Sequence, residues 1–323
     1  MKGHYIFSAL LGIGLLLQGC ETLDYTPADQ LNDKTFWRTE QHANQAAVAL
    51  YAAMKAGWAF GRDFTFDMIS DIADGTSPHA GIARGTSFSS GDASVQNTWQ
   101  YLYEVVHRSN TVIRNVSAMD IDETVKTRVI GEAKFLRAMA YFRMLNCWGG
   151  VPYYDESCII EEEFATLSNP RESAETIRGH ILDDLTDAIS KLPVAWETSD
   201  YGRATKGAAY AFKARIAIYN EDYAAAATAA KNCMDLNVYK LHSNYQDLFT
   251  ASWSDEWIFF FRGDVTLKKY YWAASDVLNS ISRLSGGWGG QKAPSYELLY
   301  AIAEKLNCSA YSLLPAESSN SGK

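Results

Sequence analysis

The stretch GEAKFLRAMAYFRMLNCWGGVPYYDE, residues 131–156, combines a long helical pattern with an abrupt stop. Apolar side chains recur here at three- and four-residue spacing, which places them on one face of a helix. The stripe consists of Val125, Val129, Ala133, Leu136, Ala140 and Met144, and is widened by Ile130, Tyr141, Phe142 and Leu145. Gly149-Gly150 and Pro152 should end the helix, because proline cannot continue it and glycine suits a C-cap. The pattern predicts a long helix packed against other elements.

Four further stretches carry the same spacing and predict a mainly α-helical chain. They are TEQHANQAAVALYAAM (39–54), WQYLYEVVHRSNTVIRNV (99–116), ESAETIRGHILDDLTDAISKLP (172–193) and two adjoining patterns within 205–236. In the last stretch Glu221-Asp222 allow only a short turn, so its two helices should run antiparallel. This unit has nearly the length of a tetratricopeptide repeat, about 34 residues. We expect tetratricopeptide-like helical hairpins with long inserted loops and little β structure.

Some expectations concern individual side chains. In the stretch 172–193 the inward residues should be Ile177, Ile181, Leu185 and Ile189, with Asp183, Asp184 and Asp187 mostly on the solvated face. Trp99 and Trp148 lie on predicted helices and should belong to the core. The run from Trp257 to Phe261 is short, apolar and aromatic, which is typical of a strand.

The composition is that of a folded protein without affinity for nucleic acid. The formal charge is -9, and the chain has no stripe of Lys and Arg that could neutralise a phosphate backbone. Beyond Cys20 the cysteines are Cys147, Cys158, Cys233 and Cys308. They form no CxxC pair and lack the spacing of metal ligands. Two alternatives stay open for them, a disulfide between Cys147 and Cys158 or buried free thiols.

The N-terminus has the features of an export signal. Lys2 precedes about 13 nearly unbroken apolar residues, fewer than the roughly 20 that a membrane-spanning helix needs. Leu17-Gln18-Gly19-Cys20 resembles the lipobox at which bacterial lipoproteins are cleaved and acylated. Residues 1–19 are therefore expected to be a signal peptide, with Cys20 as the lipidated first residue. The alternative is an ordinary secretory signal followed by a stray cysteine.

Three stretches together resemble one protein family. They are CETLDYTPADQLNDKTFWRTEQHANQAAVALYAAM (20–54), GEAKFLRAMAYFRMLNCWGGVPYYDE (131–156) and YGRATKGAAYAFKARIAIYNEDYAAA (201–226). In combination they resemble SusD/RagB-type outer-membrane nutrient-binding lipoproteins, and the match continues with YQDLF and APSYELL to about Ala301. Residues 301–323 lack the family pattern and are Ser-rich, so we expect a chain truncated or altered at the C-terminus.

The resemblance implies a function that composition alone does not reveal. It implies a SusD-like helical fold over residues 39–300, preceded by a tether and N-terminal segment at 20–38. It also implies a lipid-anchored protein on the outer face of the outer membrane, which captures an oligosaccharide or polysaccharide and delivers it to a SusC-like TonB-dependent transporter. The family signature residues, such as Arg137 and Tyr141, are expected to be structural.

Two ring-rich loops are candidates for sugar contacts, because a sugar has an apolar face that suits a flat ring and hydroxyls that need polar partners. These loops are 58–88 and 268–292. The candidate ligand-binding residues are the platform Trp58, Trp272 and Trp288, with Asp71 and Arg84 as hydroxyl partners. For each ring, simple packing is the competing interpretation.

Other functional classes find little support in the sequence. Neither HExxH nor GxSxG occurs and no motif pairs two carboxylates, so we expect no enzymatic activity, no metal and no cofactor. The alternative function is a helical-repeat scaffold lipoprotein that binds only protein partners. The sequence does not name the glycan.

The lipid anchor gives a direct prediction. Replacing Cys20 by alanine should remove the acylation site and leave soluble or unprocessed protein, because two or three acyl chains give stable anchoring. Incorporation of labelled palmitate and membrane fractionation measure this, with Cys158→Ala as the control that keeps its anchor. A Cys20→Ala protein that stays in the membrane, with a wild type that takes up no palmitate, would exclude lipidation at this residue.

Overall fold

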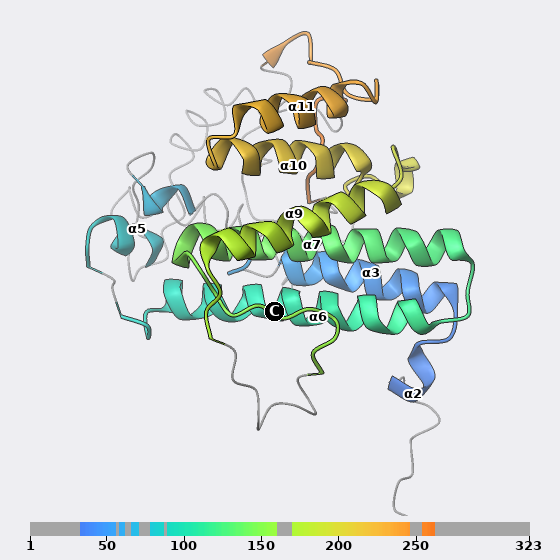
Figure 1. The fold of residues 1–323 in the computed structure, drawn as a ribbon, viewed down its shortest axis with the longest axis horizontal. Helices are drawn as coiled ribbons and strands as arrows, with labels where there is room; N and C mark the ends of the chain where they lie inside the picture. The colour runs from blue at the N-terminus through green and yellow to red at the C-terminus, as the bar shows by residue number, and fades with distance from the viewer. Residues whose placement is uncertain are drawn as a thin grey trace, which may run out of the picture.

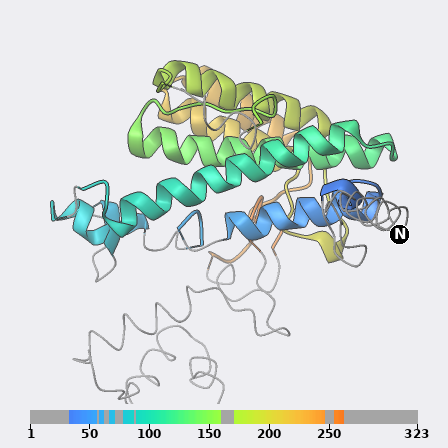
Figure 2. The same cartoon turned by 90° about the horizontal axis from the view of Figure 1, so that it is seen from below.

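The chain folds as a stack of α-helices. The computed structural model describes residues 33–55, 58–61, 66–70, 78–86, 89–159, 170–245 and 254–261. Within these ranges the regular elements are all helices and none is a strand. Figure 1 shows α6, α7, α9, α10 and α11 stacked one above the next, and α3 lies against both α6 and α7 (Figures 1 and 2). The predicted mainly α fold is therefore confirmed.

The elements have the following bounds. They are α2 (Asp33–Phe36), α3 (Glu40–Met54), η1 (Asp67–Ile69), α5 (Pro78–Ala83), α6 (Ala93–Ala118), α7 (Glu123–Trp148), α9 (Ala174–Lys191), η2 (Thr198–Asp200), α10 (Lys206–Tyr219) and α11 (Tyr223–Met234). The turn of residues 220–222 joins α10 and α11, which pack against each other as the predicted hairpin.

Short polar side chains fix where the long helices begin. The hydroxyl of Thr205 accepts a hydrogen bond from the amide of Ala208 at 3.0 Å, and the carboxylate of Asp222 accepts one from Ala225 at 3.0 Å. Thr39, Asp122 and Ser173 cap α3, α7 and α9 in the same way. Each cap satisfies backbone donors that have no partner inside the helix, and typically contributes about 1 kcal/mol.

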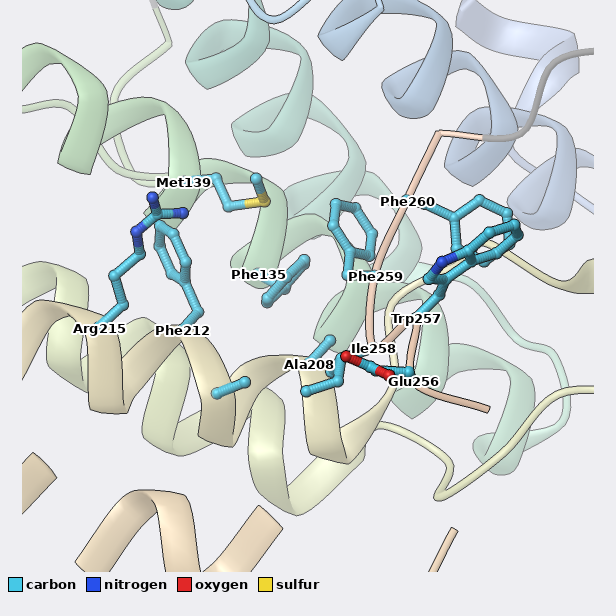
Figure 3. Close-up of a pocket in the computed structure, with 11 residues that line it drawn as sticks. Phe135, Met139, Ala208, Phe212, Arg215, Glu256, Trp257, Ile258, Phe259 and Phe260 are labelled. Carbon is cyan, nitrogen blue, oxygen red and sulfur yellow. The ribbon is translucent and has the colours of Figure 1, made fainter. Parts of the chain in front are cut away.

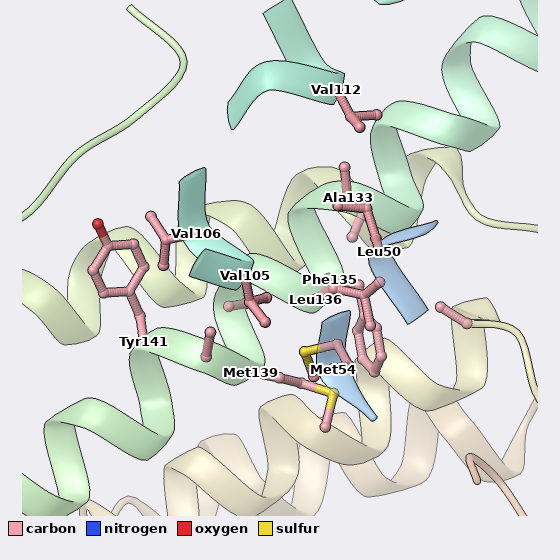
Figure 4. Packing of buried hydrophobic residues seen from close by; sticks show 14 of the residues in the cluster. Leu50, Met54, Val105, Val106, Val112, Ala133, Phe135, Leu136, Met139 and Tyr141 are labelled. Atoms are coloured by element: carbon pink, nitrogen blue, oxygen red, sulfur yellow. The ribbon is translucent and has the colours of Figure 1, made fainter. Parts of the chain in front are cut away.

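The core is built around α7. Five members of its predicted stripe, from Val129 to Met144, are buried, and Val125 is half-buried. Figure 4 shows Phe135, Leu136 and Met139 of this helix among Leu50 and Met54 of α3 and Val105 and Val106 of α6. Trp99 and Trp148 are half-buried rather than fully enclosed, and their rings meet edge to face at 5.2 Å. They pack at the margin of the core.

Two glycines let the chain reverse after α7. Gly149 has φ of 69°, in the left-handed region that favours glycine. A Cβ on Gly150 would lie 2.0 Å from the carbonyl oxygen of Glu172, so only glycine fits there. The next carbonyl, of Val151, accepts a hydrogen bond from the amide of Glu172 at 3.0 Å. The glycine pair thus brings the C-terminal end of α7 against the N-terminal end of α9.

A buried ion pair joins α7 to α9. Arg137, 2% exposed, donates two hydrogen bonds to Asp184, 5% exposed, from Nε to Oδ2 and from Nη2 to Oδ1, both at 2.7 Å. Its Nη1 donates to Asn110 and to Glu156, each at 2.6 Å. Burial alone would lower the pKa of Arg137, but the bonds and charge of Asp184 raise it, so the guanidinium stays charged.

This pairing corrects one expectation about α9. Asp184 was expected on the solvated face with Asp183 and Asp187, yet it is buried, whereas Asp183 is exposed. The reason is the arginine opposite, because a carboxylate can be buried when its charge and lone pairs are satisfied. Ile177, Ile181 and Leu185 are buried as expected.

A second buried carboxylate joins three distant segments. Glu132 of α7, fully buried, accepts hydrogen bonds from Arg203 Nε at 2.9 Å and Nη2 at 2.7 Å. The hydroxyl of Tyr51 on α3 donates to the same carboxylate at 2.7 Å and accepts from the amide of Ala204 at 2.8 Å. The connection before α10 is thereby fixed to α3 and α7.

One further expectation is wrong, and one open alternative is settled. Residues Trp257 to Phe261 form no strand, because the described part of the chain offers no neighbouring strand to complete a ladder. The amide of Trp257 instead donates a hydrogen bond to the carbonyl of Ser254 at 3.1 Å, within a turn. Of the two alternatives for the cysteines, the structure has free thiols at Cys147, Cys158 and Cys233, of which Cys233 is buried, Cys158 is partly buried and Cys147 is exposed.

The Arg137 pair gives a stability prediction with a matched control on the next residue. Asp184→Asn should lower the free energy of unfolding by about 3 to 5 kcal/mol, because it removes the buried counter-charge of Arg137 and leaves the guanidinium only the partly exposed carboxylate of Glu156. Asp183→Asn changes an exposed side chain on the same helix and should change that energy by less than about 0.5 kcal/mol. Urea unfolding followed by circular dichroism measures both. Equal effects would contradict the role assigned to the pair.

Candidate functional site

The segment 254–261, after α11, positions a row of aromatic side chains beside α7 and α10. Phe259 meets Phe135 of α7 at a ring distance of 5.1 Å, and Phe260 meets Trp257 at 5.5 Å. The carboxylate of Glu256 accepts a hydrogen bond from the amide of His242 at 2.7 Å. This segment borders two kinds of hollow, one mixed in polarity and one rich in phenylalanine rings with polar side chains beside them.

The mixed hollow, here called the Trp196 hollow, has a volume of about 270 Å³. Its rings are Trp196, Tyr201, Tyr239, Trp257 and Phe260. Arg203, Thr205 and Asp255 also line it. These residues come from the connection between α9 and α10, from the residues after α11 and from segment 254–261. The combination of flat rings with polar groups suits a ligand that has apolar faces and hydroxyls.

Trp196 is held rigidly in the wall of this hollow. Its indole Nε1 donates to the carbonyl of Ala204 at 2.7 Å. The guanidinium of Arg203 lies 4.2 Å from its ring centroid and that of Arg128 lies 5.1 Å away, both within cation–π range. Because Arg203 is also bound to Glu132, the ring takes its position from the buried network.

The polar groups of the Trp196 hollow can exchange hydrogen bonds with hydroxyls. The hydroxyl of Tyr239 lies 2.7 Å from that of Thr205, and either can be the donor. Burial raises the pKa of Tyr239, so its hydroxyl stays protonated at neutral pH. A carboxylate oxygen of Asp255 pairs with Lys240 at 3.0 Å, and that carboxylate is 42% exposed. An ionised carboxylate has about four acceptor positions, so it can accept further bonds.

The phenylalanine-rich hollow, here called the phenylalanine groove, runs between α7 and α10. Two adjoining cavities of about 610 and 620 Å³ form it. Both are lined by Met139, Phe212, Arg215, Phe259 and Phe260. Figure 3 shows Phe135, Phe212 and Phe259 facing this space, with Arg215 beside Phe212.

The residues proposed from sequence are only partly within the described chain. Trp58 is half-buried and Arg84 is exposed. Neither is among the residues that line the Trp196 hollow or the phenylalanine groove. Asp71, Trp272 and Trp288 lie outside the described residues, as does Cys20. The predicted loop 58–88 includes two short helical elements, η1 and α5.

Sequence reasoning missed the Trp196 hollow. Trp196 and Tyr239 lie in connections whose sequence spacing carries no shared motif, and only the fold brings them together with Trp257. The sequence did mark the connection before α10, because the stretch from Gly202 to Gly207, which includes Arg203, is part of the family resemblance. The basis of that signal is structural, because Arg203 neutralises the buried Glu132.

Comparison with known proteins places these features in a family. A SusD-like family model, described as starch-binding associating with outer membrane, matches residues 22–218. The chain belongs to this SusD-like family. A SusD-like protein of Formosa agariphila is 28% identical over 245 residues, which cover 72% of this chain and 46% of the relative. The starch-binding protein SusD of Bacteroides thetaiotaomicron is 26% identical over 179 residues, 53% of this chain and 30% of that protein.

Solved structures agree with the helical arrangement. A SusD-like protein of Bacteroides fragilis aligns with TM-score 0.60 and 28% identity over 72% of this chain and 46% of its own. A SusD-like carbohydrate binding protein from the same species aligns with TM-score 0.60 and 26% identity, over 66% of this chain and 44% of its own. The chain thus spans about half the length of the SusD-like proteins it matches.

The described ranges contain neither a candidate metal site nor a candidate membrane span. No cluster of three or more His, Cys, Asp or Glu side chains suited to a metal ion occurs there. Each helix in the same ranges is too short or too polar to cross a bilayer.

Proposed function

We propose that this SusD-like chain captures an oligosaccharide outside the outer membrane and passes it to a SusC-like TonB-dependent transporter. The observation that carries the proposal is the family match over residues 22–218. Two relatives support the ligand class by their names, one a starch-binding protein and one a carbohydrate binding protein. Attachment through lipid on Cys20 would hold the protein at the membrane surface. The glycan is bound without being cleaved.

The chemistry of the Trp196 hollow supports a sugar ligand. The rings of Trp257 and Phe260 offer apolar surface for the C–H face of a hexose, and Trp196, against which Arg203 stacks, lines the wall beside them. Tyr239 and Asp255 offer a hydroxyl and a carboxylate to the sugar hydroxyls. We therefore add this hollow to the loop site proposed from sequence, which consists of Trp58, Trp272 and Trp288 with Asp71 and Arg84. The two sites are distinguishable by mutation.

The helical hairpin α10–α11 supports a protein partner. Several large apolar side chains on it are exposed, and they are Ile218 (55%), Tyr219 (61%), Tyr223 (68%) and Met234 (73%). Exposed apolar side chains gathered on one element are typical of a protein-binding surface. We propose that this hairpin rests on the transporter barrel and that the ring-lined side faces the ligand.

Glycan binding is predicted to depend on the aromatic side chains that line the Trp196 hollow. Calorimetric titration of the lipid-free chain should detect a glycan from a panel that begins with malto-oligosaccharides. Trp257→Ala should weaken the affinity about tenfold, because partial burial of one ring contributes on the order of 1 to 2 kcal/mol. Tyr223→Ala, on the exposed hairpin, should leave the affinity unchanged.

The triple variant Trp58→Ala, Trp272→Ala and Trp288→Ala tests the loop site in the same assay. A loss confined to the triple variant selects the loops. A loss shared by Trp257→Ala and Tyr239→Phe selects the Trp196 hollow, because Trp257 also lines the phenylalanine groove whereas Tyr239 does not. If no glycan in the panel binds the wild-type chain, the alternative of a scaffold that binds only proteins replaces this proposal.

The transporter contact is predicted to depend on α11. A tagged chain extracted from membranes in mild detergent should bring down a β-barrel of the SusC type. Tyr223→Asp combined with Met234→Asp should reduce the recovered barrel by about tenfold or more, because burying a charge at an apolar interface is costly. Val48→Asp, at a side chain of α3 that is 57% exposed, is the matched control and should leave recovery unchanged. Absence of any barrel with the wild-type chain would argue strongly against the partnership.

A further inference from the structure

The phenylalanine groove has the chemistry of a protein contact. Phe135, Phe142 and Phe212 line it from two helices, and Phe259 and Phe260 close one side. A phenyl ring neither donates nor accepts a conventional hydrogen bond. Polar side chains line the groove as well, among them Asp67, Arg143 and Glu256, so it combines an apolar surface with charged groups. The groove therefore suits a segment that is apolar on one face and charged on the other.

The shape of the groove suits one face of a helix. On α7 the lining residues are Phe135, Met139, Phe142, Arg143 and Asn146, and on α10 they are Ala208, Ala211, Phe212, Arg215 and Tyr219. Both sets recur at three- and four-residue spacing along neighbouring helices, which produces the ridges that a third helix packs between. From Phe135 to Asn146 the helix rises about 17 Å at 1.5 Å per residue.

We propose that residues 295–306 of this chain, SYELLYAIAEKL, pack into the phenylalanine groove as an amphipathic helix. This segment lies outside the described residues. In a helix its residues Leu299, Ile302, Ala303 and Leu306 share one face, with Glu297 and Glu304 on the opposite face. Ser295 follows Pro294 and provides an N-cap. Twelve helical residues span about 18 Å, the length of the groove floor.

The path of the chain favours this occupant over a separate molecule. Phe261, the last residue described, itself lines the groove, 6.4 Å from the ring of Phe60. Residues 262–294 then provide enough chain to return to the same surface. The entropic cost of closing such a loop rises only slowly with its length. A segment tethered this way has an effective concentration that a free partner rarely reaches.

Photo-crosslinking in the full chain tests this contact without disrupting it. A photoreactive amino acid at Leu299 should form crosslinks within one chain to peptides that contain α7 residues 135–146 or α10 residues 208–219. The same group at Ala301, on the opposite face of the proposed helix, is the matched control and should give under about a fifth of that yield. Mass spectrometry of the monomer band identifies the partners.

The same experiment can overturn the proposal. Crosslinks from Leu299 that join two chains would assign the groove to a second copy. Crosslinks from a probe at Ile281, with none from Leu299, would assign it to another part of residues 262–294. Equal yields from Leu299 and Ala301, or no crosslink to either helix, would also refute the contact.

A second measurement uses radical labelling of the groove. Ile302→Asp should increase labelling of Phe212 and Phe260 by about fivefold, because a charged side chain cannot stay in the groove and solvent enters. Ala301→Asp should leave the labelling unchanged. Unchanged labelling in Ile302→Asp would contradict the proposal.

Discussion

The fold depends on two charges of opposite sign that are buried in one helix. Glu132 and Arg137 lie five positions apart on α7. The segments packed around α7 must therefore supply a cation to Glu132 and an anion to Arg137. Arg203 and Asp184 meet this demand and so fix the connection before α10 and the register of α9. A helix with only apolar contacts could slide or rotate at small cost. Buried charges restrict it to the arrangement in which each is neutralised.

The sequence predicted the helices well because their signals are local. The three- and four-residue spacing of apolar side chains on α7 and the short turn at Glu221-Asp222 need no knowledge of distant residues. The burial of Asp184 could not be predicted in this way. Asp184 stands near Asp183 and Asp187 in the sequence, and three acidic residues so close together are typical of a solvated helix face. The arginine that neutralises Asp184 is 47 positions away. Pairing across that separation is a property of the tertiary structure.

Segment 254–261 and the candidate site show the same limit. Aromatic residues from Trp257 to Phe261 favour a strand by composition, but a strand forms only where another edge completes its hydrogen bonds, and here the rings pack on helices instead. The Trp196 hollow draws its rings from three separate segments, so no single motif encodes it. The side-chain chemistry of Trp58 and Arg84 made them candidates for sugar contacts. Side-chain chemistry alone does not show whether two residues lie near the same ligand.

The hydroxyl of Tyr51 has a consequence for the order in which the chain can fold. Its two partners, Glu132 and the amide of Ala204, follow it by 81 and 153 residues. A ribosome makes α3 first, yet this helix cannot complete its polar contacts until most of the described chain has been synthesised. Contacts across such separations slow folding, because a long loop must close before they form. The apolar face of α3 packs on α6 and α7, so it can be buried before this polar contact is complete.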